Sequence, residues 1–356
     1  MARQGGQRDP AWRERRRSGE DKKKTRGRWG HTYAAVDLGT NNCRLLVARP
    51  TRDGFRVIDA FSRIVRLGEG VDRSGRLSPE AMERTITALK VCAAKMRRRG
   101  VTRARNVATA ACRRASNCNE FLARVEHQTG LRLEIISPGE EANLAVTGCR
   151  PLLDRQSRHA LVFDIGGGST ELIWVAHDQL RGAEPIAATS LPHGVVTLTE
   201  QYDGRELSPT VYEELVARIC DELHPFEQAQ QISRHIDGSA VQMIGTSGTV
   251  TTLSGVHLDL AKYDRQRVDG LWLSFVDALA VSRRLRDMSL EQRARHPCIG
   301  RDRADLVVAG CAILEAICRT WPVGRLRVGD RGLREGLLVS QMQAEDRGPP
   351  QQAAGS

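Results

Sequence analysis

The chain contains one short unit twice, and the two copies are about 127 residues apart. Each copy is an apolar strand that ends in aspartate, a glycine turn and a second strand. The first reads Val36-Asp-Leu-Gly-Thr-Asn-Asn and the second reads Asp164-Ile-Gly-Gly-Gly-Ser-Thr-Glu. Glycines let the backbone bend tightly and let main-chain N–H groups approach an anion without a Cβ in the way. The duplication therefore predicts two matched anion-binding turns, which could face each other across a cleft.

Strand and helix signals occur in both halves of the chain. Besides the repeated units, strands are predicted at 55–60, 106–110, 131–136, 241–244 and 326–328. Helices are predicted from Ser78, an N-cap before Pro79, toward Gly100, and at 119–129, 251–255, 304–318 and 333–342. A chain of 356 residues is long enough for two domains.

The formal charge of +11 is concentrated at the N-terminus. Residues 1–30 contain eleven Lys and Arg against four acidic residues, a net charge of +7, which leaves +4 for the other 326 residues. This composition predicts a solvated, disordered tail, which could also hold RNA or another polyanion weakly by counterion release. A dedicated nucleic-acid-binding protein is disfavoured, because aromatic residues make up only 4% and the charge belongs to the tail.

Three classes of protein are excluded by simple patterns. No segment approaches about 18 consecutive apolar residues, so no membrane span is predicted. The basic N-terminus lacks the apolar core of a secretory signal, so a cytoplasmic location is expected. Nine cysteines are scattered without any C-x-x-C, which favours reduced, buried thiols over a zinc site or a disulfide framework.

The glycine turns are suited to phosphate oxygens. A third turn, Gly245-Thr-Ser-Gly-Thr, follows a predicted strand and opens a helix. The aspartates at the strand ends, Asp37 and Asp164, are positioned to hold Mg²⁺ against the same oxygens. The predicted phosphate-binding residues are Gly39, Thr40, Asn41, Gly166, Gly167, Gly168, Ser169, Gly245, Thr246, Gly248 and Thr249.

The two repeated units look like the phosphate motifs of the actin, heat-shock ATPase and sugar-kinase superfamily. Within it, the sequence resembles the exopolyphosphatases and guanosine-pentaphosphate phosphohydrolases, the Ppx/GppA family. The resemblance extends from about Tyr33 to about Ser340. Its further matches are Ala108-Thr-Ala-Ala-Cys-Arg-Arg-Ala, Ile136-Ser-Pro-Gly-Glu-Glu-Ala, Leu191-Pro-His-Gly-Val-Val, Gly245-Thr-Ser-Gly-Thr, Arg303-Ala-Asp and Gly332-Leu-Arg-Glu-Gly.

The resemblance implies an α/β fold of two ribonuclease-H-like (actin-like ATPase) lobes with a phosphate-binding cleft between them. We expect the first lobe at 31–145, the second at 146–342, and disordered tails at 1–30 and 343–356. Homodimers are common in this family, although the sequence shows no interface signature.

The resemblance also implies a catalytic set. Glu141 aligns with the family's catalytic carboxylate and is the predicted general base. Arg113 resembles the arginine that binds the scissile or neighbouring phosphate, a task that suits a planar guanidinium. Asp164 and Glu171 resemble the acidic residues that support Mg²⁺ and catalysis. Asp37, Asp164 and Glu171 therefore form the predicted metal site, and Asp164 is also predicted to be catalytic.

The sequence departs from the common family pattern at three positions. Asn42 replaces a frequent serine, Pro138 precedes Gly139, and Asn143 replaces a frequent arginine. The change at Asn143 leaves the substrate preference open. Longer family members carry an additional helical region for which this chain has no room, so processive action on long polymers is not expected.

The predicted function is Mg²⁺-dependent release of terminal orthophosphate from inorganic polyphosphate, or hydrolysis of guanosine pentaphosphate, which has the same terminal phosphoanhydride. Two alternatives stay open. A sensor would bind guanosine tetra- or pentaphosphate without turnover, but it would not need Glu141. A small-molecule kinase would place ATP in the same cradles, but the Gly-Glu-Glu-Ala and Gly-Leu-Arg-Glu-Gly matches disfavour it.

Overall fold

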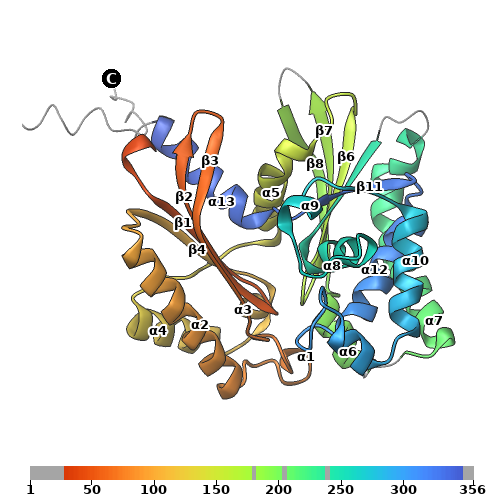
Figure 1. Cartoon of the computed structure of the whole chain (residues 1–356), viewed down its shortest axis with the longest axis horizontal. Helices are drawn as coiled ribbons and strands as arrows, with labels where there is room; N and C mark the ends of the chain where they lie inside the picture. The colour runs from red at the N-terminus through yellow and green to blue at the C-terminus, as the bar shows by residue number, and fades with distance from the viewer. Residues whose placement is uncertain (1–27, 179–181, 203–206, 237–240, 348–356) are drawn as a thin grey trace, which may run out of the picture.

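The computed structural model describes residues 28–178, 182–202, 207–236 and 241–347. These residues form two α/β lobes side by side, each built around one mixed sheet with helices packed on it (Figure 1). The disorder predicted for residues 1–27 and 348–356 lies outside the described part of the chain.

The first sheet has five strands in the order β3-β2-β1-β4-β5. β1, β2 and β3 are antiparallel neighbours, whereas β4 and β5 are added parallel to β1. The hairpin β1–β2 contains the first glycine turn, as the sequence predicts. The bounds are β1 (Tyr33–Leu38), β2 (Asn42–Thr51), β3 (Gly54–Ile64), β4 (Arg103–Ala108) and β5 (Glu134–Ile135).

The second sheet has six strands in the order β10-β11-β9-β6-β7-β8. β6, β7 and β8 are antiparallel, and β9 and β11 are added parallel to β6, so the first sheet's arrangement is repeated. The extra strand β10 pairs antiparallel with β11. The predicted duplication is therefore confirmed. The bounds are β6 (His159–Ile165), β7 (Thr170–Asp178), β8 (Gly182–Leu191), β9 (Val241–Thr246), β10 (Trp272–Ser274) and β11 (Arg325–Gly329).

Helices α2 and α4 of the first lobe pack together over one face of its sheet, whereas α1 lies toward the second lobe (Figure 1). The predicted start of α2 is confirmed, because Ser78 Oγ accepts a hydrogen bond from the N–H of Ala81 at 3.1 Å. The buried face of α2, which includes Ile86 and Leu89, packs in one apolar core with β1 and β2. The bounds are α1 (Val71–Ser74), α2 (Pro79–Arg98), α3 (Ala110–Arg114) and α4 (Cys118–Thr129).

The second lobe has the larger apolar core, with α12 buried along most of its length. α12 packs against α7, α8 and α10. The bounds are α6 (Val195–Gln201), α7 (Pro209–Gln230), α8 (Ser247–His257), α9 (Arg265–Val268), α10 (Phe275–Asp287), α11 (Leu290–Arg295) and α12 (Val307–Thr320). Short 3₁₀ turns occur at Arg28–Gly30, Arg150–Leu152 and Ile232–His235.

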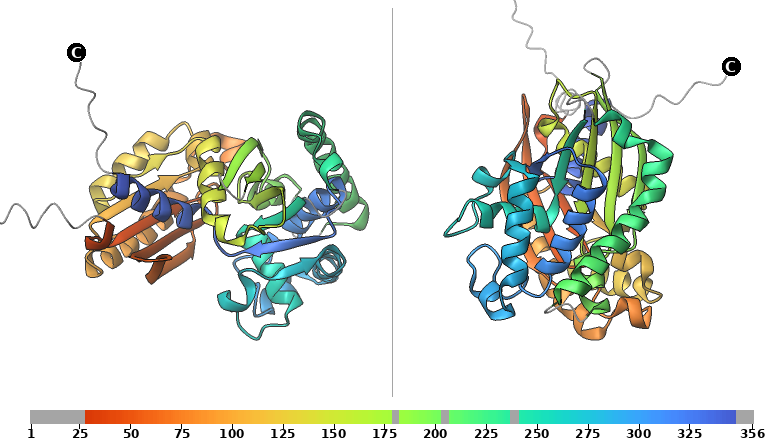
Figure 2. Two further views of the ribbon diagram at one scale, coloured as in Figure 1. Left: turned by 90° about the horizontal axis from the view of Figure 1, so that it is seen from above. Right: turned by 90° about the vertical axis from the view of Figure 1, so that its right-hand side faces the viewer.

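Two helices join the lobes, α5 (Pro138–Cys149) and α13 (Leu333–Arg347). α13 packs along α5 and on β1 and β2, although it follows the last strand of the second sheet (Figure 2, left). Leu337 and Leu338 on α13 are fully buried in a core shared with Tyr33 of β1. Burial of this apolar face explains why the chain returns to the first lobe.

The return of α13 corrects two predicted boundaries. The second lobe does not extend over the whole of 146–342, and the residues after 342 do not all belong to a tail, since α13 continues to Arg347. At the other end, residues 28–30 also belong to the fold. Arg28 forms an ion pair with Asp346 of α13 at 3.2 Å.

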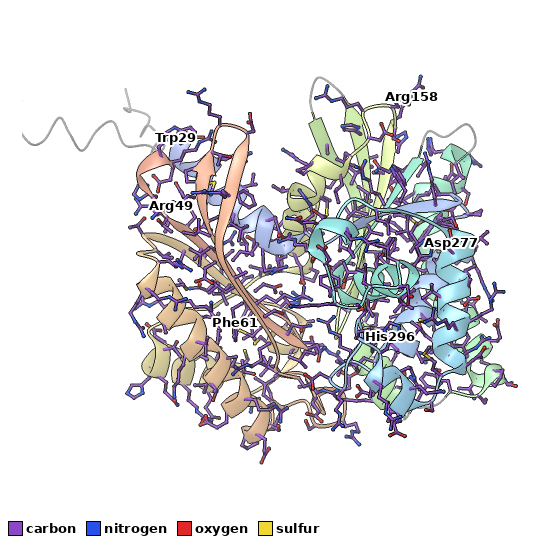
Figure 3. The ribbon with its side chains drawn as sticks, in the orientation of Figure 1. Trp29, Arg49, Phe61, Arg158, Asp277 and His296 are labelled. Carbon is purple, nitrogen blue, oxygen red and sulfur yellow. The ribbon has the colours of Figure 1, made fainter. Side chains whose placement is uncertain are left out.

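All nine cysteines lie in the described part of the chain as free thiols, and eight are buried, as predicted. Side chains fill the interior of each lobe (Figure 3). None of the helices within the described ranges is long and apolar enough to cross a membrane.

Candidate active site

The first phosphate turn joins β1 to β2. It is closed by a hydrogen bond of 2.9 Å from the N–H of Gly39 to the carbonyl oxygen of Asn42. Thr40 and Asn41, at its tip, are buried. Asp37, near the end of β1, lies opposite Arg44 in the register of the hairpin. The turn therefore places a carboxylate and a guanidinium next to the backbone that would bind an anion.

The second phosphate turn joins β6 to β7 and is closed in the same way. The N–H of Gly166 donates to the carbonyl oxygen of Ser169 at 2.9 Å. The N–H groups of Val195 and Val196, at the start of α6, donate to the carbonyl oxygens of Gly166 and Gly167 at 2.9 and 2.8 Å. The helix α6 therefore fixes the backbone of this turn.

The two turns meet tip to tip. A Cβ on Gly168 would lie 2.6 Å from Thr40 Oγ1, and a Cβ on Gly167 would lie 3.0 Å from the nitrogen of Asn41. Larger residues at either glycine would push the turns apart. Both turns border one cavity of about 70 Å³. The predicted residues that the structure brings together there are Gly39, Thr40, Asn41, Gly166, Gly167, Gly168 and Ser169.

The third turn, between β9 and α8, contributes less than predicted. Gly245 is covered by Phe163, since a Cβ there would lie 2.5 Å from the ring, and it lines none of the cavities described here. Thr246 is buried, and its hydroxyl donates to the carbonyl oxygen of Phe163 at 3.2 Å. Gly248 and Thr249 border a neighbouring cavity of about 50 Å³. Packing against Phe163 explains why position 245 is a glycine, whereas Gly248 and Thr249 stay candidates for phosphate binding.

Ser247, which is absent from the predicted set, borders all three cavities of the cleft. Its φ of 79° is a left-handed conformation that is rare for residues other than glycine and is concentrated at functional sites. The side chain of Ser247 donates a hydrogen bond to Asp164, which favours the ionised carboxylate. The third turn therefore orients the carboxylate at the second. No sequence signal reveals the conformation of Ser247.

Glu141 lies in the first turn of α5 and borders the cavity between the two phosphate turns. The helix begins at Pro138 after the N-cap Ser137, whose Oγ accepts a hydrogen bond from the N–H of Glu140 at 3.1 Å. Proline suits the first helical position, which accounts for the departure from the family pattern at Pro138. Asn143, the other departure on α5, is exposed.

Arg113, on α3, holds the Glu141 carboxylate. Its Nη1 donates to Oε2 of Glu141 at 2.8 Å and to the carbonyl oxygen of Ile136 at 3.0 Å. Arg113 is not among the residues that border the cavity. The structure therefore places it behind the carboxylate, and its contact with a phosphate stays a prediction.

The carboxylates of the cavity are difficult to ionise together. Burial raises the pKa of Glu141 to about 8; Glu171 adds to the rise and Arg113 opposes it. Burial and the charge of Asp164 raise the pKa of Glu171 to about 7, against hydrogen bonds from the hydroxyls of Ser169 (2.6 Å) and Ser190 (3.1 Å). Burial also raises the pKa of Asp164. Such a group of acids attracts a cation.

Mg²⁺ fits this donor set. Asp37, Asp164 and Glu171 all border the cavity and supply carboxylate oxygens. The part of the chain that the structure describes has no ready-made cluster of three His, Cys, Asp or Glu. Mg²⁺ does not require one, because it keeps waters and uses one or two carboxylates plus substrate phosphates. The Oδ1 atoms of Asn41 and Asn42 are buried without a hydrogen-bond partner, a cost that a hydrated cation would relieve.

A larger cavity of about 450 Å³ continues from the same acids and is lined by arginines. Arg44, Arg303 and Arg334 border it, and none of them is in the predicted set. Burial and the charge of Arg44 lower the pKa of Arg303. A bound anion would relieve this repulsion. The repeat itself could have revealed Arg44, which follows Asp37 by the same seven residues that separate Asp164 from Glu171.

Known proteins match nearly the whole described fold. The model of the Ppx/GppA phosphatase family matches residues 46–345. The chain belongs to this family. It is 32% identical over 322 residues to Exopolyphosphatase 2 of Mycobacterium tuberculosis, and the match covers 86% of this chain and 97% of that protein. The predicted Ppx/GppA family, and with it an enzyme of the phosphatase class, is confirmed.

Solved Ppx/GppA structures share the fold. An exopolyphosphatase-like protein matches with a TM-score of 0.80 and 31% identity, over 88% of this chain and 99% of that chain. The Aquifex aeolicus member matches with a TM-score of 0.70 and 31% identity, over 88% and 98%. The predicted pair of actin-like lobes is therefore confirmed.

Proposed function

We propose that the chain is a Mg²⁺-dependent exopolyphosphatase that releases terminal orthophosphate from inorganic polyphosphate. The observation that carries the proposal is the position of Glu141, which borders a small cavity between two phosphate turns and is held there by a hydrogen bond from Arg113. A carboxylate there is next to the place where a terminal phosphate would lie. The Mycobacterium tuberculosis relative, which carries the name exopolyphosphatase, supports the choice of substrate.

The chemistry needs little more than positioning. A water next to Glu141 attacks the terminal phosphorus in line with the bridging oxygen, and Glu141 accepts the water's proton. The bond between that phosphorus and the bridging oxygen breaks, so the products are orthophosphate and a chain one phosphate shorter. Arg113 keeps the carboxylate oriented during the proton transfer.

The phosphate turns and the arginines bind the charge of the chain. Backbone N–H groups of both turns would hold the terminal phosphate, and Arg44 and Arg303 would contact the phosphates that follow in the larger cavity. Mg²⁺, when bound, would offset the negative charge on the phosphate oxygens. Asp37 and Asp164 would hold it with support from Glu171.

Guanosine pentaphosphate is a second candidate substrate. It presents the same terminal phosphoanhydride, and the cavity of about 450 Å³ offers room for the rest of a nucleotide next to Tyr263. Binding without turnover would instead indicate a sensor of such nucleotides.

The decisive experiment measures orthophosphate release with Mg²⁺ from long polyphosphate, short polyphosphate and guanosine pentaphosphate in parallel. The variants are E141A and the control E140A. Glu140 is adjacent, but it pairs on the outside with Arg105. We expect E141A to lose about two orders of magnitude or more, as for removal of a general base, and E140A to stay near the wild type. A chelator should abolish release, and added Mg²⁺ should restore it.

The outcomes separate the candidates. Release from polyphosphate that depends on Glu141 supports the exopolyphosphatase. Release confined to guanosine pentaphosphate would mean that this nucleotide, and not polyphosphate, is the substrate. No release from any of the three, with retained binding of guanosine pentaphosphate, would contradict the hydrolase and leave the sensor.

A further inference from the structure

A short segment of the first lobe crosses to the second lobe at the end of the cleft opposite to α13. This strap, residues 65–70, lies between β3 and α1. α1 lies beside α6 at the bottom of Figure 1. Figure 3 labels Phe61 in the first lobe, four residues before the strap begins. It also labels His296 in the second lobe, which precedes the segment that the strap contacts.

The side chain of Arg66 links the strap to the second lobe. Its Nη1 and Nη2 donate to Oδ2 and Oδ1 of Asp305 at 2.8 and 2.9 Å, and Nη2 also donates to the carbonyl oxygen of Asp302 at 3.1 Å. Such a bidentate pair is the strong, geometrically specific form of an arginine–carboxylate contact. The side chains of Arg66 and Asp305 are only 30% and 19% exposed, so the pair is partly shielded from solvent.

The strap also holds the first phosphate turn. The N–H groups of Val65 and Arg66 both donate to the carbonyl oxygen of Asn41, at 2.8 and 3.1 Å. The N–H of Gly68 donates to the carbonyl oxygen of Thr40 at 2.9 Å, and Gly68 has no Cβ where the Thr40 methyl lies. A displacement of the strap therefore displaces the backbone that faces the substrate phosphates.

On the opposite side, the strap meets the elements that hold the second phosphate turn and the cleft. The N–H of Gly70 donates to Oε1 of Glu200 at 2.9 Å. Glu200 is on α6, the helix whose first N–H groups bind the second turn. Asp305 lies two residues after Arg303, which borders the cleft. The strap thus joins the supports of both turns.

The backbone of Arg66 gives an independent reason to look for a role of its side chain. Its φ of 47° is left-handed, a conformation that glycine adopts with less strain. An arginine in this position is explained if the side chain has a task that glycine could not perform.

We propose that Arg66 is a positioning residue that sets the spacing of the two phosphate turns through its pair with Asp305. Arg66 lines none of the three cavities of the cleft, so it acts through the turns and not on substrate. The kinetic part of this inference rests on the proposed phosphohydrolase function. Closure of the lobes around the substrate assembles the site, and the Arg66–Asp305 pair stabilises the closed arrangement.

The test is a double-mutant cycle on kcat/KM with short polyphosphate and guanosine pentaphosphate. We expect R66A and D305A each to lower kcat/KM about tenfold, and the double variant to be no slower than either, because all three lack the same link. The charge exchange R66D/D305R should recover part of the loss. R66G should unfold at a higher temperature than R66A and yet be as slow, which a purely structural role would not produce.

The matched control is R84A. Arg84 also makes three hydrogen bonds to the strap, to the carbonyl oxygens of Val65 and Arg66 and to Glu69, but none of them crosses to the second lobe. We expect R84A to lose less than twofold in kcat/KM. A loss in R84A equal to that in R66A would overturn the proposal, and so would additive effects of R66A and D305A.

A structural readout separates this proposal from the proposed function. If the wild type released no orthophosphate, small-angle X-ray scattering would still measure how far apart the two lobes lie in each variant. R66A and D305A should then have a larger radius of gyration than the wild type and R84A. An unchanged radius of gyration in both variants would overturn the proposed role of the Arg66–Asp305 pair, even in an inactive protein.

Discussion

Glu141 lies where three influences on its charge compete. Burial and the neighbouring Glu171 favour the protonated acid, whereas the ion pair with Arg113 favours the carboxylate, and the balance raises its pKa to about 8. The first turn of α5 adds a helix N-terminus, which also favours the carboxylate. A base with a pKa near the working pH accepts a proton readily and still releases it.

The raised pKa predicts a pH dependence of catalysis. The base acts as the carboxylate, so kcat/KM should fall about tenfold per pH unit below a midpoint at or just below pH 8 and level off above it. Cation binding next to Glu171 moves the midpoint down, because it favours ionised acids. The measurement is kcat/KM from pH 5.5 to 9.5 at saturating Mg²⁺. The residual rate of E141Q should lack this step, and a flat wild-type profile would contradict the assignment.

Individual residues also show which parts of the site could be predicted from the sequence and which could not. The aspartate and glycine positions follow from the repeated unit, because a strand, a tight turn and an anion site require these residue types. Arg44 and Glu171 occupy equivalent positions after their aspartates, yet one is a cation and the other an acid, so the repeat predicts the position and not the charge. Ser247 was unpredictable, because its backbone conformation depends on the surrounding fold.

At the scale of elements, the position of the proposed general base, Glu141, depends on the crossing of α5 and α13. α13 lies against α5 so closely that a Cβ on Gly336 would overlap the carbonyl of Leu144, and a Cβ on Gly148 would overlap the carbonyl of Gly332. This contact accounts for the second glycine of the Gly-Leu-Arg-Glu-Gly match, Gly336, and for Gly148 on α5. The crossing positions the helix that carries Glu141.

The crossing predicts an unusual effect of G336A. Alanine ordinarily stabilises a helix interior relative to glycine by about 1 kcal/mol. Here the added methyl group must separate two backbones, so we expect the free energy of unfolding to fall by about 1–3 kcal/mol and kcat to fall with it. Urea unfolding and orthophosphate release measure the two effects. S340A, on the same helix, is the control with little change, and a G336A protein more stable than the wild type would refute the tight crossing.

Two of the elements that escaped prediction, β8 and α7, contain a proline in their interior. β8 contains Pro185, which a central strand would not tolerate; it fits because β8 is an edge strand whose ladder with β7 is interrupted next to this proline, at Ile186. α7 contains Pro225 well inside the helix. Both depend on neighbours that local patterns do not reveal, whereas β1, β2, β6 and α2 were predictable because their turns and caps are local.

At the scale of the whole molecule, the duplicated sheets place two phosphate turns face to face, and more than half of the net positive charge belongs to the N-terminal residues of the sequence. Residues 1–27 contain ten Lys and Arg against four acids, a net charge of +6. A long polyanion that enters the cleft can contact such a segment at the same time, whereas a short chain occupies the cleft alone. The segment would then act by raising the local concentration of long polymers.

This argument predicts a chain-length effect. Deletion of residues 1–27, which leaves Arg28 and its ion pair with Asp346 in place, should raise KM for long polyphosphate several-fold and leave KM for short polyphosphate and kcat nearly unchanged. The control replaces every Lys and Arg of 1–27 with Gln and should behave like the deletion. Because the attraction is electrostatic, the difference should disappear between 50 and 200 mM salt. Equal shifts of KM for long and short chains would mean that the charged segment does not capture polymer.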